Sequence, residues 1–155
     1  MTTTFYDAVQ ALRADYPDER SAVLPALRLA QERHGGWLPE EALREVAEAL
    51  DLTPAYCDSI ASFYDMFHTE PVGRHLVEVC TNVSCALSGA QAVVESFERE
   101  LGISIGETTE GNGVTLRAVE CLGGCGWATV VALDNRHRLH VRAADVPAIV
   151  GELRE

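Results

Sequence analysis

The segment from His75 to Cys85 reads HLVEVCTNVSC and decides how the second half of the chain is organised. It begins as an apolar stretch typical of a strand, and Cys80 stands where that strand ends. Cys85 immediately precedes an amphipathic helical pattern. The apolar positions of this pattern are Leu87, Ala90, Val94, Phe97 and Leu101. We therefore expect a strand-to-helix loop between the two cysteines, with free backbone amides that face a site.

A second pair of cysteines, Cys121 and Cys125, lies in the sequence CLGGC. The glycines in and after this pair favour a loop whose backbone N–H groups approach the site closely. In an extended segment, Cys80 and Cys85 would lie about 16 Å apart, so the segment must curl if the two are to share a metal. Two pairs on two loops predict one metal centre.

Clustered thiolates usually hold zinc or an iron-sulfur cluster. Zinc sites favour tight CxxC knuckles, which this sequence lacks. A [2Fe-2S] cluster takes two thiolates on each iron, and two separated pairs meet that count. The spacing favours iron-sulfur, while a zinc-stabilised interaction module held by the four cysteines and an enzyme of thiol-disulfide exchange remain as alternatives.

The rest of the second half also alternates between strand and helix patterns. Strands are expected at 114–119, at 129–133 and near 137–141, with a turn at 134–136. A short helix closes the chain, and its inward positions are Val146, Ile149, Val150 and Leu153. The order strand, helix, strands, helix describes a small α/β layer fold.

The first half has helical periodicity. Helices are expected over 18–34, over 38–50 and from Thr53-Pro54 onward. The last should align Tyr56, Ile60, Phe63 and Phe67 on one face. Proline and glycine at 69–74 then break the pattern. We expect a helical bundle over residues 1–71 and a cluster domain over residues 72–155.

Composition narrows the function of this chain of 155 residues. A formal charge of -12 disfavours nucleic acid and anionic membrane surfaces as partners. Its apolar runs are too short for membrane insertion, and its start lacks the pattern of an export signal, so we expect a cytoplasmic protein without structural disulfides. It has no GxGxxG loop and no nucleophile-base pair, so the sequence shows neither a dinucleotide-binding loop nor a catalytic pair of its own.

Five segments, in this order along the chain, carry a family resemblance. They are Gln31–Pro39, Ala61–Phe67, Pro71–Gly73, Val79–Cys85 and Cys121–Cys125. Together they resemble the thioredoxin-like iron-sulfur E subunit of bacterial NADH:quinone oxidoreductase, respiratory complex I. The resemblance implies an α+β architecture, an N-terminal helical bundle followed by a thioredoxin-like [2Fe-2S] ferredoxin domain. It also makes Cys80 and Cys85 the ligands of one iron, and Cys121 and Cys125 those of the other.

The same resemblance implies a place in a larger oxidoreductase. A partner flavoprotein subunit would bind NADH and FMN, and this chain's cluster would exchange single electrons with the flavin. By this resemblance we expect the isolated chain to carry electrons without turning over NADH. The complex would carry the chain in a peripheral arm on the inner face of the membrane. Small subunits of NAD-dependent formate dehydrogenases and NAD-reducing hydrogenases are also similar, so they remain alternatives.

Two details of the sequence bear on the cluster. Cys57 matches no ligand of the family. Members of the family usually have proline a few residues after the last ligand, where this sequence has Thr129; the difference concerns the local turn. Because reduction adds negative charge to the cluster, we expect backbone donors at 84–87 and 123–127, with Gly124 and Gly126 foremost, to help set its potential.

Overall fold

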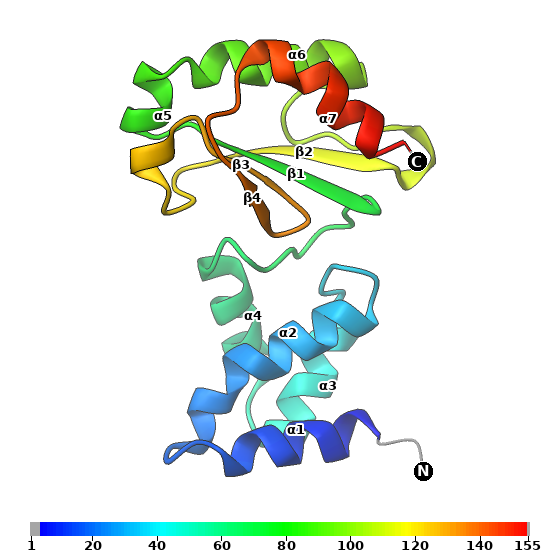
Figure 1. The fold of residues 1–155 in the computed structure, drawn as a ribbon. Helices are drawn as coiled ribbons and strands as arrows, with labels where there is room; N and C mark the ends of the chain where they lie inside the picture. Colours follow the sequence, from blue (N-terminus) through cyan, green and yellow to red (C-terminus); the bar gives the residue numbers. More distant parts are fainter. Residues whose placement is uncertain (1–3, 155) are drawn as a thin grey trace. The chain divides into compact units, whose positions relative to one another are not determined.

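The computed structural model describes residues 4–154. Contacts divide the chain into two compact units, Met1–Pro71 and Val72–Glu155. In the described residues, the first unit is built of helices and the second combines a sheet with helices (Figure 1). No helix in the described part is long and apolar enough to cross a membrane.

Local sequence signals account for the helices of the first unit. These are α1 (Phe5–Ala14), a 3-10 helix (Glu19–Ala22), α2 (Val23–Arg33), α3 (Glu40–Leu50) and α4 (Pro54–Phe63). Thr53 caps α4 by accepting a hydrogen bond from the amide of Tyr56 (3.2 Å), and Pro54 occupies the first turn. The helix expected over 18–34 is two pieces, with Pro25 in the first turn of α2, where proline is tolerated.

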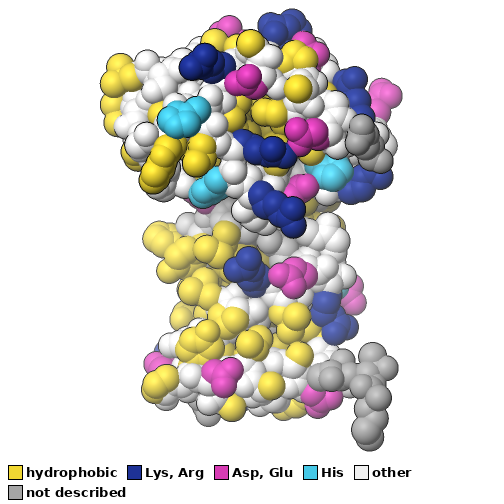
Figure 2. Space-filling model, in the orientation of Figure 1, with side chains coloured by type: hydrophobic (Ala, Val, Ile, Leu, Met, Phe, Trp, Pro, Cys, Tyr) yellow, Lys and Arg dark blue, Asp and Glu magenta, His cyan; other side chains and the backbone are white. Residues whose placement is uncertain are grey.

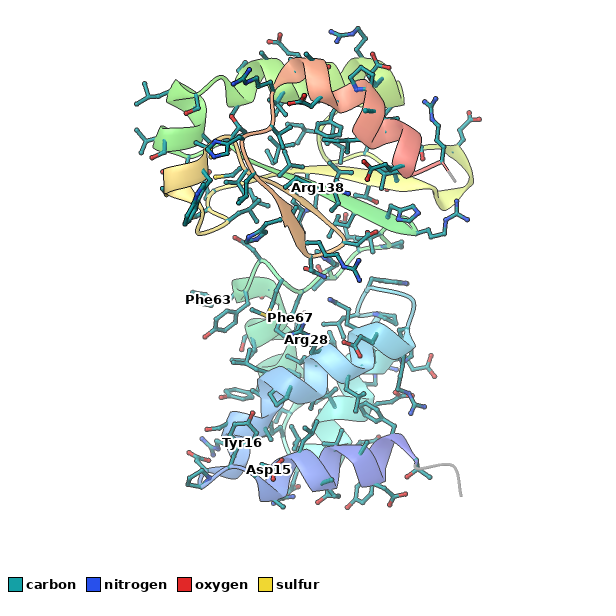
Figure 3. The ribbon with its side chains drawn as sticks, viewed as in Figure 1. Asp15, Tyr16, Arg28, Phe63, Phe67 and Arg138 are labelled. Atoms are coloured by element: carbon teal, nitrogen blue, oxygen red, sulfur yellow. The ribbon has the colours of Figure 1, made fainter. Side chains whose placement is uncertain are left out.

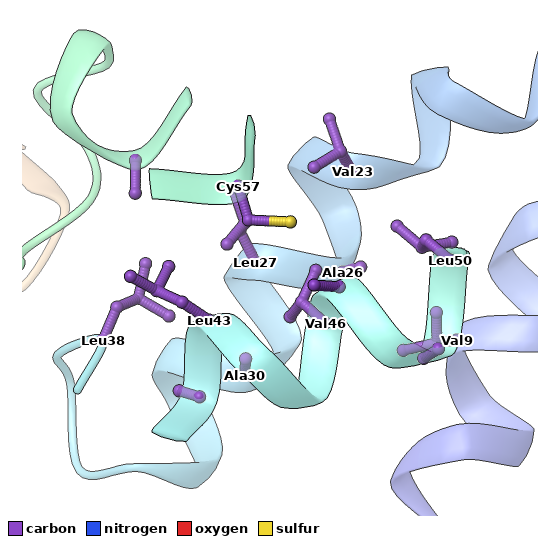
Figure 4. Packing of buried hydrophobic residues seen from close by; sticks show 14 of the residues in the cluster. Val9, Val23, Ala26, Leu27, Ala30, Leu38, Leu43, Val46, Leu50 and Cys57 are labelled. Carbon is purple, nitrogen blue, oxygen red and sulfur yellow. The ribbon is translucent and has the colours of Figure 1, made fainter. Parts of the chain in front are cut away.

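Helices α2 and α3 pack on each other and, with α1 and α4, enclose one apolar core (Figure 4). Fully buried positions include Val9, Leu27, Leu38, Val46 and Cys57. Burial raises the pKa of the Cys57 thiol. This cysteine therefore behaves as a small apolar side chain of the helical unit.

The prediction that one helical face runs from Tyr56 to Phe67 is wrong for its last two residues, Phe63 and Phe67. Helix α4 ends at Phe63, which is 76% exposed, whereas Phe67 lies beyond the helix and is buried (Figure 3). Gln31 on α2 causes the difference, since its side chain donates to the carbonyl of Met66 (3.1 Å) and accepts from the amide of His68 (2.8 Å). These two bonds turn the intervening phenylalanine into the core.

The second unit is built on a four-stranded sheet in the order β2-β1-β3-β4. The strands are β1 (His75–Cys80), β2 (Val114–Val119), β3 (Val131–Leu133) and β4 (Arg136–Arg138). Strand β1 is parallel to β2 and antiparallel to β3. Helices α6 (Ala90–Leu101) and α7 (Val146–Glu152) lie side by side on one face of the sheet (Figure 1). This mixed α+β arrangement bears out the expected fold class.

The core of this unit lies between the sheet and the two helices, and it contains Val77, Phe97, Leu116, Val146 and Val150. Strand β2 and helix α7 follow the predicted ranges closely. Strands β3 and β4 are shorter than predicted, and the side chains of β4 are exposed.

Leu87 was expected on the buried face of the long helix, and this expectation is wrong. It lies in a separate short helix, α5 (Val83–Leu87), and is 85% exposed. The helical pattern breaks at Gly89, whose φ of 96° falls in the left-handed region that glycine tolerates best. The chain therefore changes direction between Cys85 and α6.

Candidate metal centre

The paired strands bring both cysteine segments to one edge of the sheet. Cys80 is the last residue of β1 and pairs with Val119, the last residue of β2. Cys121 follows two residues later. Ligands commonly bind beyond the carboxyl ends of parallel strands, and this is where both segments begin.

The first pair curls as its spacing requires. Asn82 caps α5 by accepting from the amide of Val83 (2.7 Å), and its carbonyl accepts from the amide of Ala86 (2.8 Å). Cys85 therefore sits within a short helix instead of immediately before the long one. Since the amide of Ala86 is used inside this helix, it is not the free donor that the sequence led us to expect.

The thiols of Cys80 and Cys85 are buried together in a small apolar cluster with Ala90 and Val130. Burial raises the pKa of Cys85, the amide of Val130 lowers it by donating to the sulfur, and the neighbouring Cys80 raises it again. Cys125 is close enough to raise it further. Two of the other predicted ligand thiols therefore lie close enough to act on Cys85.

The second pair is more accessible, since Cys121 and Cys125 are both exposed. The amide of Gly123 donates to the sulfur of Cys121 (3.3 Å), and the φ of this glycine is 70°. Cys125 begins a 3-10 helix, η3 (Cys125–Trp127), which contacts α5. The loop thus holds one thiol beside the helix that carries Cys85.

Gly124 and Gly126 differ in what surrounds them. A Cβ at Gly124 would lie 2.8 Å from Cγ2 of Val130, whereas a Cβ at Gly126 would meet nothing within 4 Å. Glycine at 124 lets the loop approach the side chain that packs on the first cysteine pair. The expected influence of these two glycines on a cluster potential stays a prediction.

Two residues of the site were missed as contributors when only sequence patterns were considered. Val130 contacts the first pair, and Thr129 before it is 1% exposed. The Ala128–Thr129 peptide bond is cis. In the part of the chain that the structure describes, no group hydrogen-bonds to Oγ1 of Thr129. In the sequence, Thr129 stands out only because the family usually has proline at this position.

The donor chemistry of the site fits an iron-sulfur group. The cysteines are free thiols, and two backbone amides donate to sulfur. Within residues 4–154, no three His, Cys, Asp or Glu side chains are gathered as a site for one metal ion. Cys80 and Cys125 both lie close to Cys85, and a binuclear group takes two thiolates on each of its irons.

Three apolar side chains near the two cysteine segments are exposed to solvent. Val83 and Leu87 on α5 and Trp127 on η3 are all more than half exposed. Figure 2 shows hydrophobic side chains gathered on the side of the second unit where α5 and η3 lie. Such a concentration of exposed apolar side chains often marks an interaction surface.

Comparison with known proteins identifies the family. The profile of the thioredoxin-like [2Fe-2S] ferredoxin family matches residues 9–154. The NADH-quinone oxidoreductase E subunit 2 of Rhizobium meliloti (strain 1021) is 42% identical over 151 residues, which cover 97% of this chain and 89% of the relative. Mitochondrial NADH dehydrogenase [ubiquinone] flavoprotein 2 of Dictyostelium discoideum is 38% identical over 129 residues, which cover 82% of this chain and 52% of the relative.

A solved NAD+-reducing [NiFe]-hydrogenase shares the fold, with a TM-score of 0.74 and 23% identity. The match covers 85% of this chain and 22% of the hydrogenase chain. The family profile bears out the expected class of cofactor, a [2Fe-2S] cluster. Both the sequence match and the fold of the described residues lead to one conclusion: this chain belongs to the thioredoxin-like [2Fe-2S] ferredoxin family.

Proposed function

We propose that this chain is an electron-transfer subunit of an NADH:quinone oxidoreductase. It would hold one [2Fe-2S] cluster through Cys80, Cys85, Cys121 and Cys125. The observation that carries the proposal is the pair of cysteine loops at the carboxyl ends of β1 and β2, in a chain 42% identical to an E subunit over nearly its whole length. The hydrogenase match supports the fold alone, so the quinone oxidoreductase is the preferred host.

The chain's own residues explain how such a site would work. A bound cluster accepts and returns one electron, and its reduced form carries one more negative charge. The buried surroundings of Cys80 and Cys85 oppose that charge, while the amides of Val130 and Gly123 favour it. A net contribution of about 1 kcal/mol per hydrogen bond corresponds to roughly 40 mV for one electron.

The proposed partner is an NADH-binding flavoprotein subunit that carries FMN. The exposed Val83, Leu87 and Trp127 beside the two loops form a surface that such a partner could cover, bringing its flavin near the cluster. Other peripheral-arm subunits would complete the complex at the inner face of the membrane. In this assembly NADH is oxidised in the partner, and the present chain passes single electrons.

Anaerobic purification of the full chain with its cluster tests the proposal. We expect two irons and two acid-labile sulfides per chain and an EPR signal from an S = 1/2 centre on reduction. Replacing each proposed ligand by serine should remove or alter that signal. Cys57→Ser is the matched control, because that thiol is buried in the helical unit. One zinc and no sulfide per chain would contradict the proposal.

The partner is tested separately by co-expression with the flavoprotein subunit of the same host. We expect the two chains to co-purify with FMN bound. Leu87→Glu should weaken the association, since it places a charge on the exposed apolar surface, and should leave the cluster in place. Loss of the cluster together with the association would mean that Leu87 acts on the metal centre instead.

A further inference from the structure

Thr129 presents the one buried polar side-chain atom without a partner in the described part of the chain. The residue is 1% exposed, so bulk solvent does not reach it. Buried hydroxyls are almost always hydrogen-bonded, because losing water without gaining another partner costs stability. This hydroxyl therefore needs a partner that residues 4–154 do not supply.

The backbone around Thr129 is fixed on both sides. Its carbonyl accepts from the amide of Val141 (2.9 Å), and the carbonyl of Val130 accepts from the amide of Cys80 (3.1 Å). Backbone hydrogen bonds thus join this segment to β1 and to Val141.

The neighbours of Thr129 in the sequence both touch the cysteine site. Val130 packs on Cys80 and Cys85 and donates its amide to the sulfur of Cys85. Ala128 packs against the same cluster of side chains. Thr129 and its buried hydroxyl therefore lie between two residues whose side chains line the proposed metal centre.

We infer that the hydroxyl of Thr129 donates a hydrogen bond to a sulfur of the bound [2Fe-2S] cluster, an inference that rests on the proposed function. Thiolate and sulfide sulfurs accept hydrogen bonds and have no proton to give, so the threonine must be the donor. It then acts as a tuning residue of the cluster and does not ligate iron.

Such a bond has a predictable effect on the potential. Reduction increases the negative charge on sulfur, so the bond strengthens in the reduced form and favours reduction. Removing the hydroxyl should lower the equilibrium constant for one-electron reduction by about tenfold, which is about 59 mV in midpoint potential.

The test compares Thr129→Val with Thr129→Ser in the full cluster-loaded chain. Valine keeps the shape and removes the hydroxyl, whereas serine keeps the hydroxyl. We expect the valine variant to have the lower midpoint and to lose one exchangeable deuteron coupling in pulsed EPR of the reduced cluster in D2O. The serine variant should keep both properties of the wild type.

Thermal unfolding of the cluster-free chain supplies a second readout. There the valine variant should be at least as stable as the wild type, because the hydroxyl has no partner to lose. If the valine variant fails to fold, Thr129→Ala gives the same comparison with a smaller side chain.

The outcomes separate the two proposals. An unchanged midpoint and an unchanged deuteron coupling in a loaded hydroxyl-free variant would overturn the role of Thr129 and leave the electron-transfer function standing. A wild-type chain that assembles no cluster with two irons and two sulfides would overturn both.

Discussion

The contact between Gly124 and Val130 is the tightest steric demand at the cysteine site. A Cβ at position 124 would meet Cγ2 of Val130 at 2.8 Å, and that valine is buried against Cys80 and Cys85. The valine side chain is branched at Cβ and only 1% exposed, so it has few other rotamers to adopt. The loop of the second cysteine pair therefore meets the site of the first at this side chain.

Gly124→Ala should accordingly destabilise the chain by about 1–3 kcal/mol, as overpacking does in a filled site. Gly126→Ala is the control from the same loop, and with open space around it the change should stay within about 0.5 kcal/mol. Denaturant unfolding measures both variants. Equal effects would show that Val130 yields to the extra methyl group.

The double variant Gly124→Ala/Val130→Ala then tests the contact itself. Removing the valine side chain makes room for the alanine, so the two changes together should cost less than the sum of the single changes. Strict additivity would mean that the glycine is needed for another reason.

At the level of helices, α1 is held at its start by a pair of reciprocal bonds. Thr4 accepts from the amide of Asp7 (3.1 Å), and the carboxylate of Asp7 accepts from the amide of Thr4 (3.2 Å). The hydroxyl of Thr4 donates to the same carboxylate (2.6 Å), and this bond, followed by the bond from the Thr4 amide, lowers the pKa of Asp7. The carboxylate is thus favoured in the folded helix over the protonated acid.

This pKa direction predicts a pH dependence. A lowered folded-state pKa contributes stability that is present above the ordinary aspartate pKa of about 4 and is lost as the pH falls through the folded value. Asp7→Asn should therefore reduce the dependence of α1 stability on pH in the acid range. Hydrogen exchange of α1 amides between neutral and acid pH measures it, and an identical slope in both proteins would count against the assignment.

Gln31 offers a second test at the level of elements, because it ties α2 to the segment after α4. Gln31→Ala removes the bonds to Met66 and His68, so it should destabilise the helical unit by about 1–3 kcal/mol and expose Phe67. Arg28→Ala, exposed on the same helix, should have little effect. Denaturant unfolding compares the two, and similar losses would show that Gln31 does no more than a surface residue.

The elements that could be predicted from sequence are those whose signal is local. Helix α3 and strand β2 follow from their periodicity, and the cap at Thr53 fixes the start of α4. The position of Phe67 could not be predicted, since it depends on Gln31, which is distant in sequence. Leu87 was misplaced because its spacing continues the pattern of α6, whereas Gly89 breaks the backbone.

The positions of the cysteine pairs could also be predicted from local sequence signals. Their spacing and the glycines of the second loop indicated two converging segments, and the fold places both at one edge of the sheet. The contributions of Val130 and Thr129 depend on how the segment that leads into β3 pairs with β1, which no local pattern encodes. Assignment of the individual cysteines as ligands stays a prediction that the serine variants address.

For the whole molecule, the division of contacts at Pro71 and Val72 gives the proposed two-domain organisation a physical basis. Each unit has its own buried cluster, one around Leu27 and Val46 and the other around Val77 and Phe97. Since the second unit also holds both cysteine pairs, it contains every residue that the proposed cluster needs.

We therefore expect a fragment of residues 72–155 to fold and to assemble the cluster, with the EPR signal of the full chain. A fragment of residues 81–155 is the matched control: it lacks β1, which pairs with both β2 and β3 and supplies Cys80, so it should neither unfold cooperatively nor hold iron. Iron and sulfide analysis with thermal unfolding measures both fragments. If the longer fragment fails to fold, the core between the sheet and helices α6 and α7 is insufficient by itself, and the helical unit must supply stability to the metal centre.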